Sequence, residues 1–471
     1  MSKSPQAPTH NPDGTSDPRL PMSLCLGFGV GTVGVSIMLN GVTAYFPAFM
    51  STVLGKDAEI AGYLLMLSKL YDAFADFVIG SLSDRTRSRW GRRRPFLLAG
   101  GLVSAISFIM IFSPPAMADE YIVYYMFAAL VIYSTGYSLF NVPYMAMPSE
   151  MTGSKYQRSR LLSVRTVFVS LGQTLAMAGT AALISWGGGD ANGYQIMGWT
   201  MGLAIGSAML LSFFGTAKAP HLDVAEGSHA LSWESLKLMF ANRPFMMIVA
   251  AKIFQFLSFA SVATTSLLFQ LNVLMVGYAG QMKLALAQNI AAAFSMPFWL
   301  WMERRFGKRN AYFFGIAGMA LISFSWLFAD RSIDNWGFIW RGVISGVASG
   351  GMILMSISMF SDTLAHDRAI TGMRREGMLS SVIAVIEKTT FALGVAAVGI
   401  YLSYANYLPT KGGQIIEQPE SAINALYYCF TLVPVFFAVC NALCISFYTI
   451  GGRYQNSEPA AVEVAQAEPK I

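Results

Sequence analysis

The chain alternates between long apolar segments and short polar connections. We count about twelve apolar segments of about 20 residues or more, which is the length that an α-helix needs to cross the hydrocarbon core of a bilayer. They lie at 23–53, 59–83, 95–114, 121–147, 161–186, 195–215, 245–277, 282–302, 311–329, 337–361, 379–405 and 424–450. The pattern predicts an all-α integral membrane protein.

The longest internal polar connection separates the sixth segment from the seventh. It predicts an N-terminal six-helix bundle at 22–215, a cytosolic central loop at 216–243 and a C-terminal six-helix bundle at 244–450. The polar ends, 1–21 and 451–471, are expected to be cytosolic tails.

The two halves echo each other in sequence. RSRWGRRRPFLLAG follows the second segment and MERRFGKRNAYFFGIAG follows the eighth, so that Gly91 corresponds to Gly307 and Arg92 to Lys308. An internal duplication of six spans is typical of transporters that bind their solute near the midplane, between the two repeats.

Composition supports the membrane prediction and excludes other classes. Hydrophobic residues make up 54% of the 471 and charged residues only 12%, against about 25% charged in soluble domains. The four cysteines and four histidines show no metal or redox spacing, and no nucleophile or cofactor motif stands out. We therefore expect neither an enzyme nor a cofactor other than a coupling ion.

Basic residues are distributed unevenly between the connections. With the N-terminus taken as cytosolic, the inward connections hold about 19 Lys and Arg and the outward ones about four. This asymmetry predicts a multi-pass protein of the cell inner membrane with both termini in the cytosol. It also explains the net charge of +6 without a nucleic-acid partner.

Two carboxylates lie inside the second segment. Asp72 and Asp76 are four residues apart and share one face of a helix. Acids within a bilayer are costly and usually mark an ion or substrate path, so we expect them to hold Na⁺ or to accept a proton. The alternative is a structural role, with each acid paired to a Lys or Arg across a helix interface; Lys69 is a further, local candidate.

Lys388 lies in the middle of the eleventh segment and needs a counter-charge. Asp72 or Asp76 in the other half is the natural candidate, and such a bridge would couple cation binding to movement of the bundles. The alternative is a static pair with Glu387, although adjacent residues on a helix point about 100° apart.

A polar set in the fourth and fifth segments is a candidate substrate site. Arg165 can donate several hydrogen bonds to a polar solute, or else extend to the cytosolic surface. Tyr137, Ser138, Asn141 and Tyr144 lie close together in the fourth segment, where ordinary interhelical hydrogen bonds are the alternative role.

Charged residues at the cytosolic ends of the segments form a candidate gate, whose alternative role is to set membrane orientation alone. The gate candidates are Asp84, Arg85, Arg92, Arg93, Asp362, Arg374 and Arg375.

Three motifs resemble the glycoside–pentoside–hexuronide:cation symporter family of the major facilitator superfamily. DAFADFVIGSLSDRTRSRWGRRRP is similar to the family's second-helix pattern D-x-x-x-D-P-x-x-G and the basic loop after it. NVPYMAMPSEMT with RSRLLSVR is similar to its fourth- and fifth-helix patterns. FSDTLAHDRAITGMRREG, followed by Lys388, is similar to its tenth- and eleventh-helix patterns. The resemblance implies the major facilitator fold.

The resemblance also implies roles for particular residues. The acids that bind the coupling cation correspond to Asp72 and Asp76, the nearby helix-eleven lysine to Lys388, and the arginine near the sugar to Arg165. Ala75 stands where sodium-binding members have Asn, which adds weight to proton coupling and leaves both ions open.

We therefore expect a secondary active transporter that works by alternating access, with symport of a sugar, a glycoside or a related small organic solute together with Na⁺ or H⁺. The expected partners are that solute, the coupling cation and the lipid bilayer, with the protein as a monomer. The alternatives are an uncoupled facilitator, a lipid or lysolipid transporter of the same fold, and a non-transporting membrane sensor.

Overall fold

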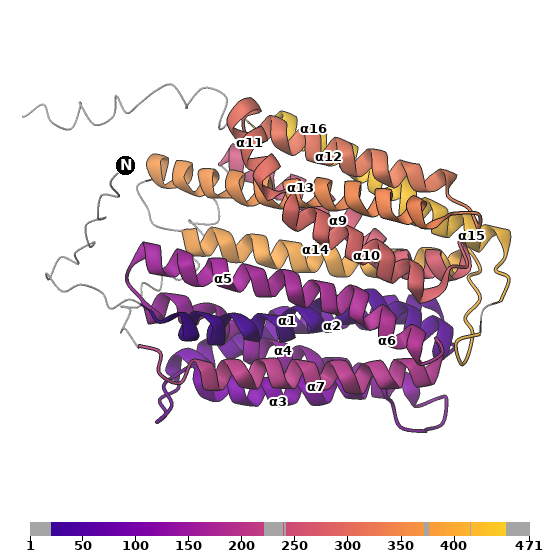
Figure 1. The fold of residues 1–471 in the computed structure, drawn as a ribbon, viewed down its shortest axis with the longest axis horizontal. Helices are drawn as coiled ribbons and strands as arrows, with labels where there is room; N and C mark the ends of the chain where they lie inside the picture. Colours follow the sequence, from indigo (N-terminus) through magenta and orange to yellow (C-terminus); the bar gives the residue numbers. More distant parts are fainter. Residues whose placement is uncertain (1–19, 221–238, 240–241, 372–375, 415, 449–471) are drawn as a thin grey trace, which may run out of the picture.

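In the computed structural model, the described residues are 20–220, 239, 242–371, 376–414 and 416–448. They form a bundle of roughly parallel and antiparallel helices, with the N-terminal helices on one side and the C-terminal helices on the other (Figure 1). The two tails and most of the predicted central loop lie outside the described residues, so the predicted domain boundaries there stay predictions.

The N-terminal half holds six rods, two of which contain a π-turn. The elements are α1 (Met22–Ala48) with η1 (Phe49–Val53), α2 (Ala58–Arg85), α3 (Arg94–Phe112), α4 (Ile122–Met151), α5 (Lys155–Thr174) with η2 (Leu175–Gly179) and α6 (Thr180–Trp186), and α7 (Ala191–Gly215).

The described part of the C-terminal half also holds six rods. The elements are α9 (Arg243–Asn272), α10 (Gly277–Phe294) with α11 (Met296–Phe306), α12 (Lys308–Ser325) with η3 (Trp326–Phe328), α13 (Asn335–Thr371), α14 (Glu376–Tyr404), and α15 (Glu420–Tyr427) with η4 (Tyr428–Leu432) and α16 (Val433–Ser446). Each predicted segment therefore corresponds to one rod.

Ten of these rods in the described chain are long and apolar enough to cross a membrane by length and composition. The other two are α2 and α10–α11. Three charged residues, Lys69, Asp72 and Asp76, fall in the middle of α2, and α10 and α11 are separated at Ser295. Two of these three charged residues, Asp72 and Asp76, form the cation site that the sequence predicts.

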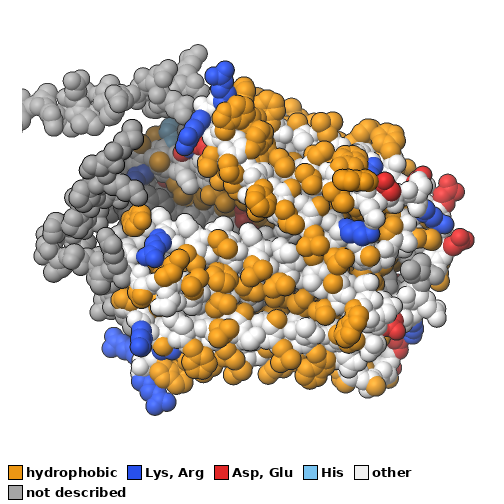
Figure 2. All heavy atoms as spheres, viewed as in Figure 1, with side chains coloured by type: hydrophobic (Ala, Val, Ile, Leu, Met, Phe, Trp, Pro, Cys, Tyr) orange, Lys and Arg blue, Asp and Glu red, His pale blue; other side chains and the backbone are white. Residues whose placement is uncertain are grey.

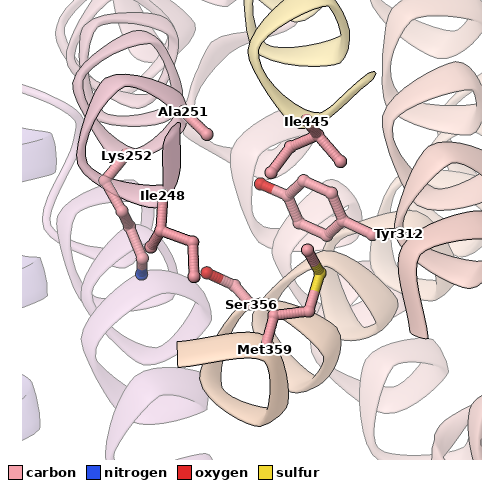
Figure 3. A pocket seen from close by; sticks show the side chains of 7 residues that line it. All are labelled: Ile248, Ala251, Lys252, Tyr312, Ser356, Met359 and Ile445. Carbon is pink, nitrogen blue, oxygen red and sulfur yellow. The ribbon is translucent and has the colours of Figure 1, made fainter. Parts of the chain in front are cut away.

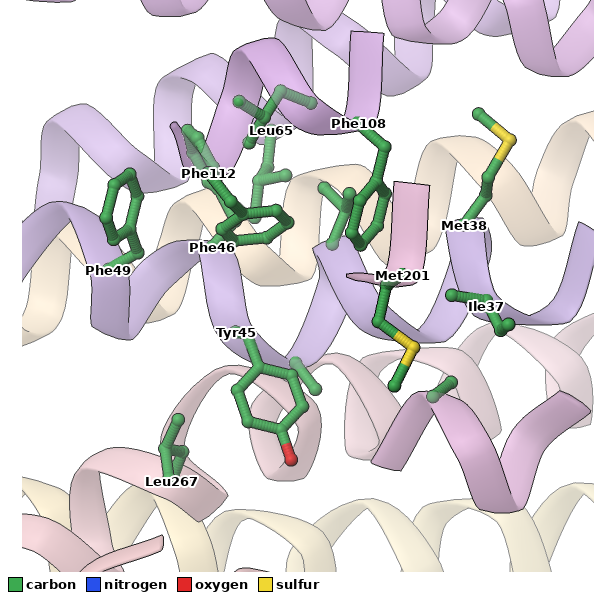
Figure 4. Close-up of a cluster of buried hydrophobic side chains, with 14 of the residues drawn as sticks. Ile37, Met38, Tyr45, Phe46, Phe49, Leu65, Phe108, Phe112, Met201 and Leu267 are labelled. Atoms are coloured by element: carbon green, nitrogen blue, oxygen red, sulfur yellow. The ribbon is translucent and has the colours of Figure 1, made fainter. Parts of the chain in front are cut away.

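A shared apolar core joins the two halves towards one end of the bundle. Large buried side chains of α1, such as Tyr45 and Phe46, pack with residues of α2, α3 and α7 and with Leu267 from α9 in the C-terminal half (Figure 4). A second cluster, which includes Phe245, Trp299 and Tyr312, belongs to the C-terminal half alone. The halves are therefore packed together at the end where α1 finishes.

At the opposite end the surface is hollowed between the halves. Figure 2 shows this hollow between α5 and the C-terminal helices, towards the end where α5 begins. The bundle is thus closed where α1 ends and α2 begins, and hollowed near the other ends of these helices.

Small residues bring α2 and α14 close together across the boundary. A Cβ atom added at Gly62 would lie 3.2 Å from the Cα of Ala396, and one added at Gly399 would lie 2.6 Å from the carbonyl oxygen of Ala58. Small residues at a helix interface let the two backbones approach closely. This seam sets the register between the acids on α2 and the lysine on α14.

Candidate functional site

Asp72, Asp76 and Lys388 meet across the boundary between the halves. The Lys388 Nζ lies 2.8 Å from Asp72 Oδ2 and also donates to Asp76 Oδ2. The Asp72 side chain is only 4% exposed, whereas those of Asp76 and Lys388 are 28% and 29% exposed. One end of the cluster is therefore sealed and the other is accessible.

The cluster lies about halfway along α2. Asp72 comes 14 residues after the first residue of that helix, which is a rise of about 21 Å along a helix of about 42 Å. A site at this depth, made from residues of both halves, has the location that alternating access requires of a coupling site.

Ser138 on α4 completes this cluster. Its hydroxyl lies 3.0 Å from Asp72 Oδ1 and 2.6 Å from Asp76 Oδ1. We predicted a role in substrate binding for Ser138, which stays a prediction, and the structure brings its hydroxyl to the carboxylates. The prediction for Ser138 rested on its closeness in sequence to the other polar residues of α4. That closeness does not reveal which neighbouring helix its side chain faces.

The structure pairs both acids with a lysine across a helix interface, which the structural and the functional interpretation both expect. Lys69 is buried beside Asp72, but the described carboxylates that form ion pairs on this seam bind Lys388 and not Lys69. Glu387 Oε1 lies 3.0 Å from Lys252 Nζ on α9, so it does not pair with Lys388. The charges of α14 are therefore divided between two helices.

Lys252 also borders a small cavity within the C-terminal half. The cavity has a volume of about 10 Å³ and is lined by side chains from α9, α12, α13 and α16 (Figure 3). That volume is about the minimum for one water molecule. This cavity therefore cannot hold a sugar.

The predicted substrate residues on α4 and α5 lie near one another. Arg165 interacts electrostatically with Tyr137 and Tyr144, and its Nε is buried without a hydrogen-bond partner in the described structure. The Tyr144 hydroxyl is within 2.6 Å of both Thr32 Oγ1 and the Phe28 carbonyl oxygen. Asn141 is half-buried one turn before Tyr144. Arg165 and Asn141 thus retain polar groups for a solute, whereas Tyr144 already bonds to α1.

Three of the four gate candidates in the N-terminal half, Asp84, Arg92 and Arg93, form one network at the C-terminal ends of α2 and α4. Arg93 Nη2 lies 2.5 Å from Asp84 Oδ1, and Arg93 Nε lies 2.8 Å from Glu150 Oε1. Arg92 Nη2 also reaches Glu150, at 3.0 Å. Glu150 was not among the predicted gate residues, because its partners Arg92 and Arg93 come from a loop distant in sequence.

The C-terminal half repeats this arrangement with other residues. Lys308 Nζ lies 2.6 Å from Asp362 Oδ2, towards the C-terminal end of α13. Gly91 precedes Arg92, and Gly307 precedes Lys308 at the corresponding position of the other half. The φ angles of these two glycines are 86° and 81°. Such φ values favour glycine. Arg374 and Arg375 lie outside the described residues, and the predicted gating role of the whole set stays a prediction.

No group of three or more His, Cys, Asp or Glu side chains suited to a metal ion occurs among the described residues. At the central cluster, the oxygen atoms available to hold a sodium ion include those of Asp72, Asp76 and the Ser138 hydroxyl.

Comparisons with known proteins identify the family. A family model described as "MFS/sugar transport protein" matches residues 27–452. The isoprimeverose transporter of Lactiplantibacillus pentosus is 24% identical, over 92% of this chain and 89% of its own. The putative glycoside/cation symporter YagG of Escherichia coli is 26% identical, over 92% of this chain and 93% of its own.

A solved structure shows the same fold. A bacterial homolog of the human lysosomal transporter Spinster, in an inward-facing and unoccupied conformation, is similar with a TM-score of 0.66 and 14% identity. The match covers 91% of this chain and 95% of that one.

These findings confirm the predicted fold and the predicted family. The chain belongs to the MFS/sugar transport protein family, as one of its glycoside–pentoside–hexuronide:cation symporters, and it is a multi-pass membrane transporter rather than an enzyme.

Proposed function

We propose that this transporter carries a sugar or glycoside into the cell together with a cation that binds at Asp72 and Asp76. The observation that carries the proposal is the position of Lys388, whose ammonium bridges both carboxylates from the opposite half. In this arrangement Lys388 occupies the place of the coupling cation.

Charge competition explains how ion binding and movement are coupled. A proton or Na⁺ that binds the carboxylates weakens their attraction for Lys388, because the negative charge that holds the ammonium is then shared. Release of Lys388 removes a bridge between α2 and α14 and frees the halves to rearrange. The Ser138 hydroxyl rotates to suit either a carboxylate or a bound cation, since it both donates and accepts.

The solute site follows from Arg165, Asn141 and Tyr137. They lie on α4 and α5, and Tyr137 belongs to the same helix as Ser138. The named relatives are an isoprimeverose transporter and a putative glycoside/cation symporter, which supports a sugar or glycoside as the solute. We place both termini in the cytosol and the protein in the inner membrane, as a monomer in lipid with no cofactor other than the coupling ion.

The test is uptake by the purified protein in liposomes. A panel of labelled sugars, glycosides and organic acids is offered, and inward Na⁺ and H⁺ gradients are imposed separately. We expect one gradient to drive accumulation of at least one solute above equilibrium, and the gradient that does so identifies the ion.

Uptake that only equilibrates the solute under both gradients would make the protein an uncoupled facilitator. Movement of a labelled lysolipid in place of every sugar would make it a lipid transporter of the same fold. Either result would overturn the proposal.

A further inference from the structure

The outer end of α1 carries three backbone carbonyls that its own helix does not use. The rod finishes with the π-turn η1, where the N–H of Leu54 bonds the carbonyl of Phe49 and that of Lys56 bonds the carbonyl of Met50. The carbonyls of Ser51, Thr52 and Val53 come next. At a helix end, such carbonyls need hydrogen-bond donors from outside the helix.

A strap from the other half supplies these partners. We define the strap as residues 410–413, which lie between α14 and α15. The N–H of Thr410 donates to the carbonyl of Ser51 at 2.7 Å, and the Thr410 hydroxyl donates to the carbonyl of Thr52 at 3.1 Å. The N–H of Gly412 donates to the carbonyl of Val53, and the N–H of Gly413 donates to the carbonyl of Thr52, both at 2.9 Å. Each of the three open carbonyls is thereby satisfied across the boundary.

Charged side chains reinforce the strap. Lys411 Nζ lies 3.3 Å from Asp119 Oδ2, and Lys56 Nζ lies 3.2 Å from the same oxygen. Hydrogen bonds from Lys56 and Lys411 lower the pKa of Asp119, so its carboxylate is ionised at neutral pH. Asp119, in the loop between α3 and α4, therefore forms ion pairs with Lys56 of the N-terminal half and with Lys411 of the C-terminal half.

The backbone of the strap is fitted to the N-terminal half. Gly412 and Gly413 have φ angles of 68° and 79°, which glycine adopts without strain. A Cβ atom at Gly413 would lie 2.8 Å from the Cα of Asp190, whereas one at Gly412 would meet nothing within 4 Å. The two glycines share a conformation and both donate a backbone hydrogen bond to the other half, but only at Gly413 would an added Cβ atom collide with it.

We propose that the strap is a latch that holds the outer face of the transporter shut, and that its release from Ser51, Thr52 and Val53 precedes opening to the outside. The inference rests on the proposed function and topology for its direction. It goes beyond them by assigning the closure to a backbone pairing of the loop between the eleventh and twelfth spans.

The strength of the latch suits a reversible device. Water replaces each backbone bond when the strap leaves, so every bond contributes only a modest net stabilisation. The ion pairs of Asp119 are exposed and add little more. The strap therefore sets how often the outward-open state is populated, without locking the protein permanently.

The first experiment measures hydrogen exchange by mass spectrometry on the full-length protein in lipid nanodiscs. The amides of Thr410, Gly412 and Gly413 should be protected although they lie in a loop, because each donates to a carbonyl of η1. Lys411→Ala should raise their exchange roughly two- to fivefold, the effect of losing one exposed ion pair. Lys283→Ala is the matched control, because Lys283 binds Asn335 at 2.6 Å within the C-terminal half alone. It should leave the exchange of the strap unchanged.

The second experiment compares Gly413→Ala with Gly412→Ala. Both place a side chain at a positive φ, but only Gly413→Ala collides with the N-terminal half, so it should raise exchange roughly tenfold above its control. Because a more populated outward-open state lowers the apparent dissociation constant, the external KM for solute should fall in Gly413→Ala and Lys411→Ala.

Two results would overturn the latch. One is unchanged exchange of residues 410–413 in both Lys411→Ala and Gly413→Ala. The other is exchange raised as much in the controls Lys283→Ala and Gly412→Ala as in these two variants. The exchange readout needs no transported solute, so failure of the proposed symport and failure of the latch are separate results.

Discussion

Glu387 and Lys388 are neighbours on α14, yet their ion-pair partners lie in different halves. Glu387 binds Lys252 on α9 of its own half, and Lys388 binds Asp72 and Asp76 on α2 of the other. A step of one residue turns the side chain by about 100°, which is enough to face a different helix. A pair within one half persists when the halves move, whereas a pair between halves must break or rearrange. The difference predicts a structural role for the first and a coupling role for the second.

The largest effect is expected at the carboxylates. Asp72→Asn or Asp76→Asn should abolish gradient-driven accumulation and weaken cation binding by about two orders of magnitude or more. The reason is that the bound cation then loses one of the two carboxylates that balance its charge. The check is uptake in liposomes under each gradient, with circular dichroism to verify folding. Wild-type accumulation in Asp76→Asn would remove that residue from the coupling role.

Lys388→Ala should follow in size. Without the ammonium, cation binding no longer changes the contact between α2 and α14, so accumulation should fall by about 5- to 150-fold, the usual range of a coupling free energy. Equilibrative exchange of solute should remain. The measurement is the cation dependence of uptake, and an unchanged dependence would refute the charge bridge.

Ser138→Ala should have a smaller effect on the same site. It removes one hydroxyl that bonds both carboxylates, so the apparent cation affinity should fall roughly tenfold. A cation titration of uptake provides the check. Ser134→Ala is the control, since Ser134 lies one turn earlier on α4 and bonds Ser68 instead.

Glu387→Gln should change transport least. It breaks a partly exposed pair within one half, so it should lower the free energy of unfolding by about 1–2 kcal/mol and leave the cation dependence of uptake unchanged. Thermal unfolding of Glu387→Gln, Lys252→Met and the double variant measures the pair energy as a cycle. A shifted cation dependence in Glu387→Gln would erase the distinction between the two pairs.

Local patterns carried much of the candidate site. The spacing of Asp72 and Asp76 predicted one shared helix face, and the position of Lys388 in the middle of an apolar segment predicted a bridge to the other half, which the structure has. The contact of Ser138 with the carboxylates was not predicted, because the sequence does not show the rotation of α4 about its axis. Glu150 was missed for a related reason, since its partners Arg92 and Arg93 come from a loop distant in sequence.

The spans, the two halves and the family follow from the amino-acid sequence because each rests on local properties. A bilayer demands about 20 apolar residues in a row wherever a helix crosses it, and motif spacing is read along the chain. The partner of Glu387, the face of Ser138 and the closure of α1 by residues 410–413 depend instead on how helices rotate and pack. Those contacts join residues distant in sequence through backbone and side-chain geometry, which hydropathy does not encode, so the assembled bundle decides them.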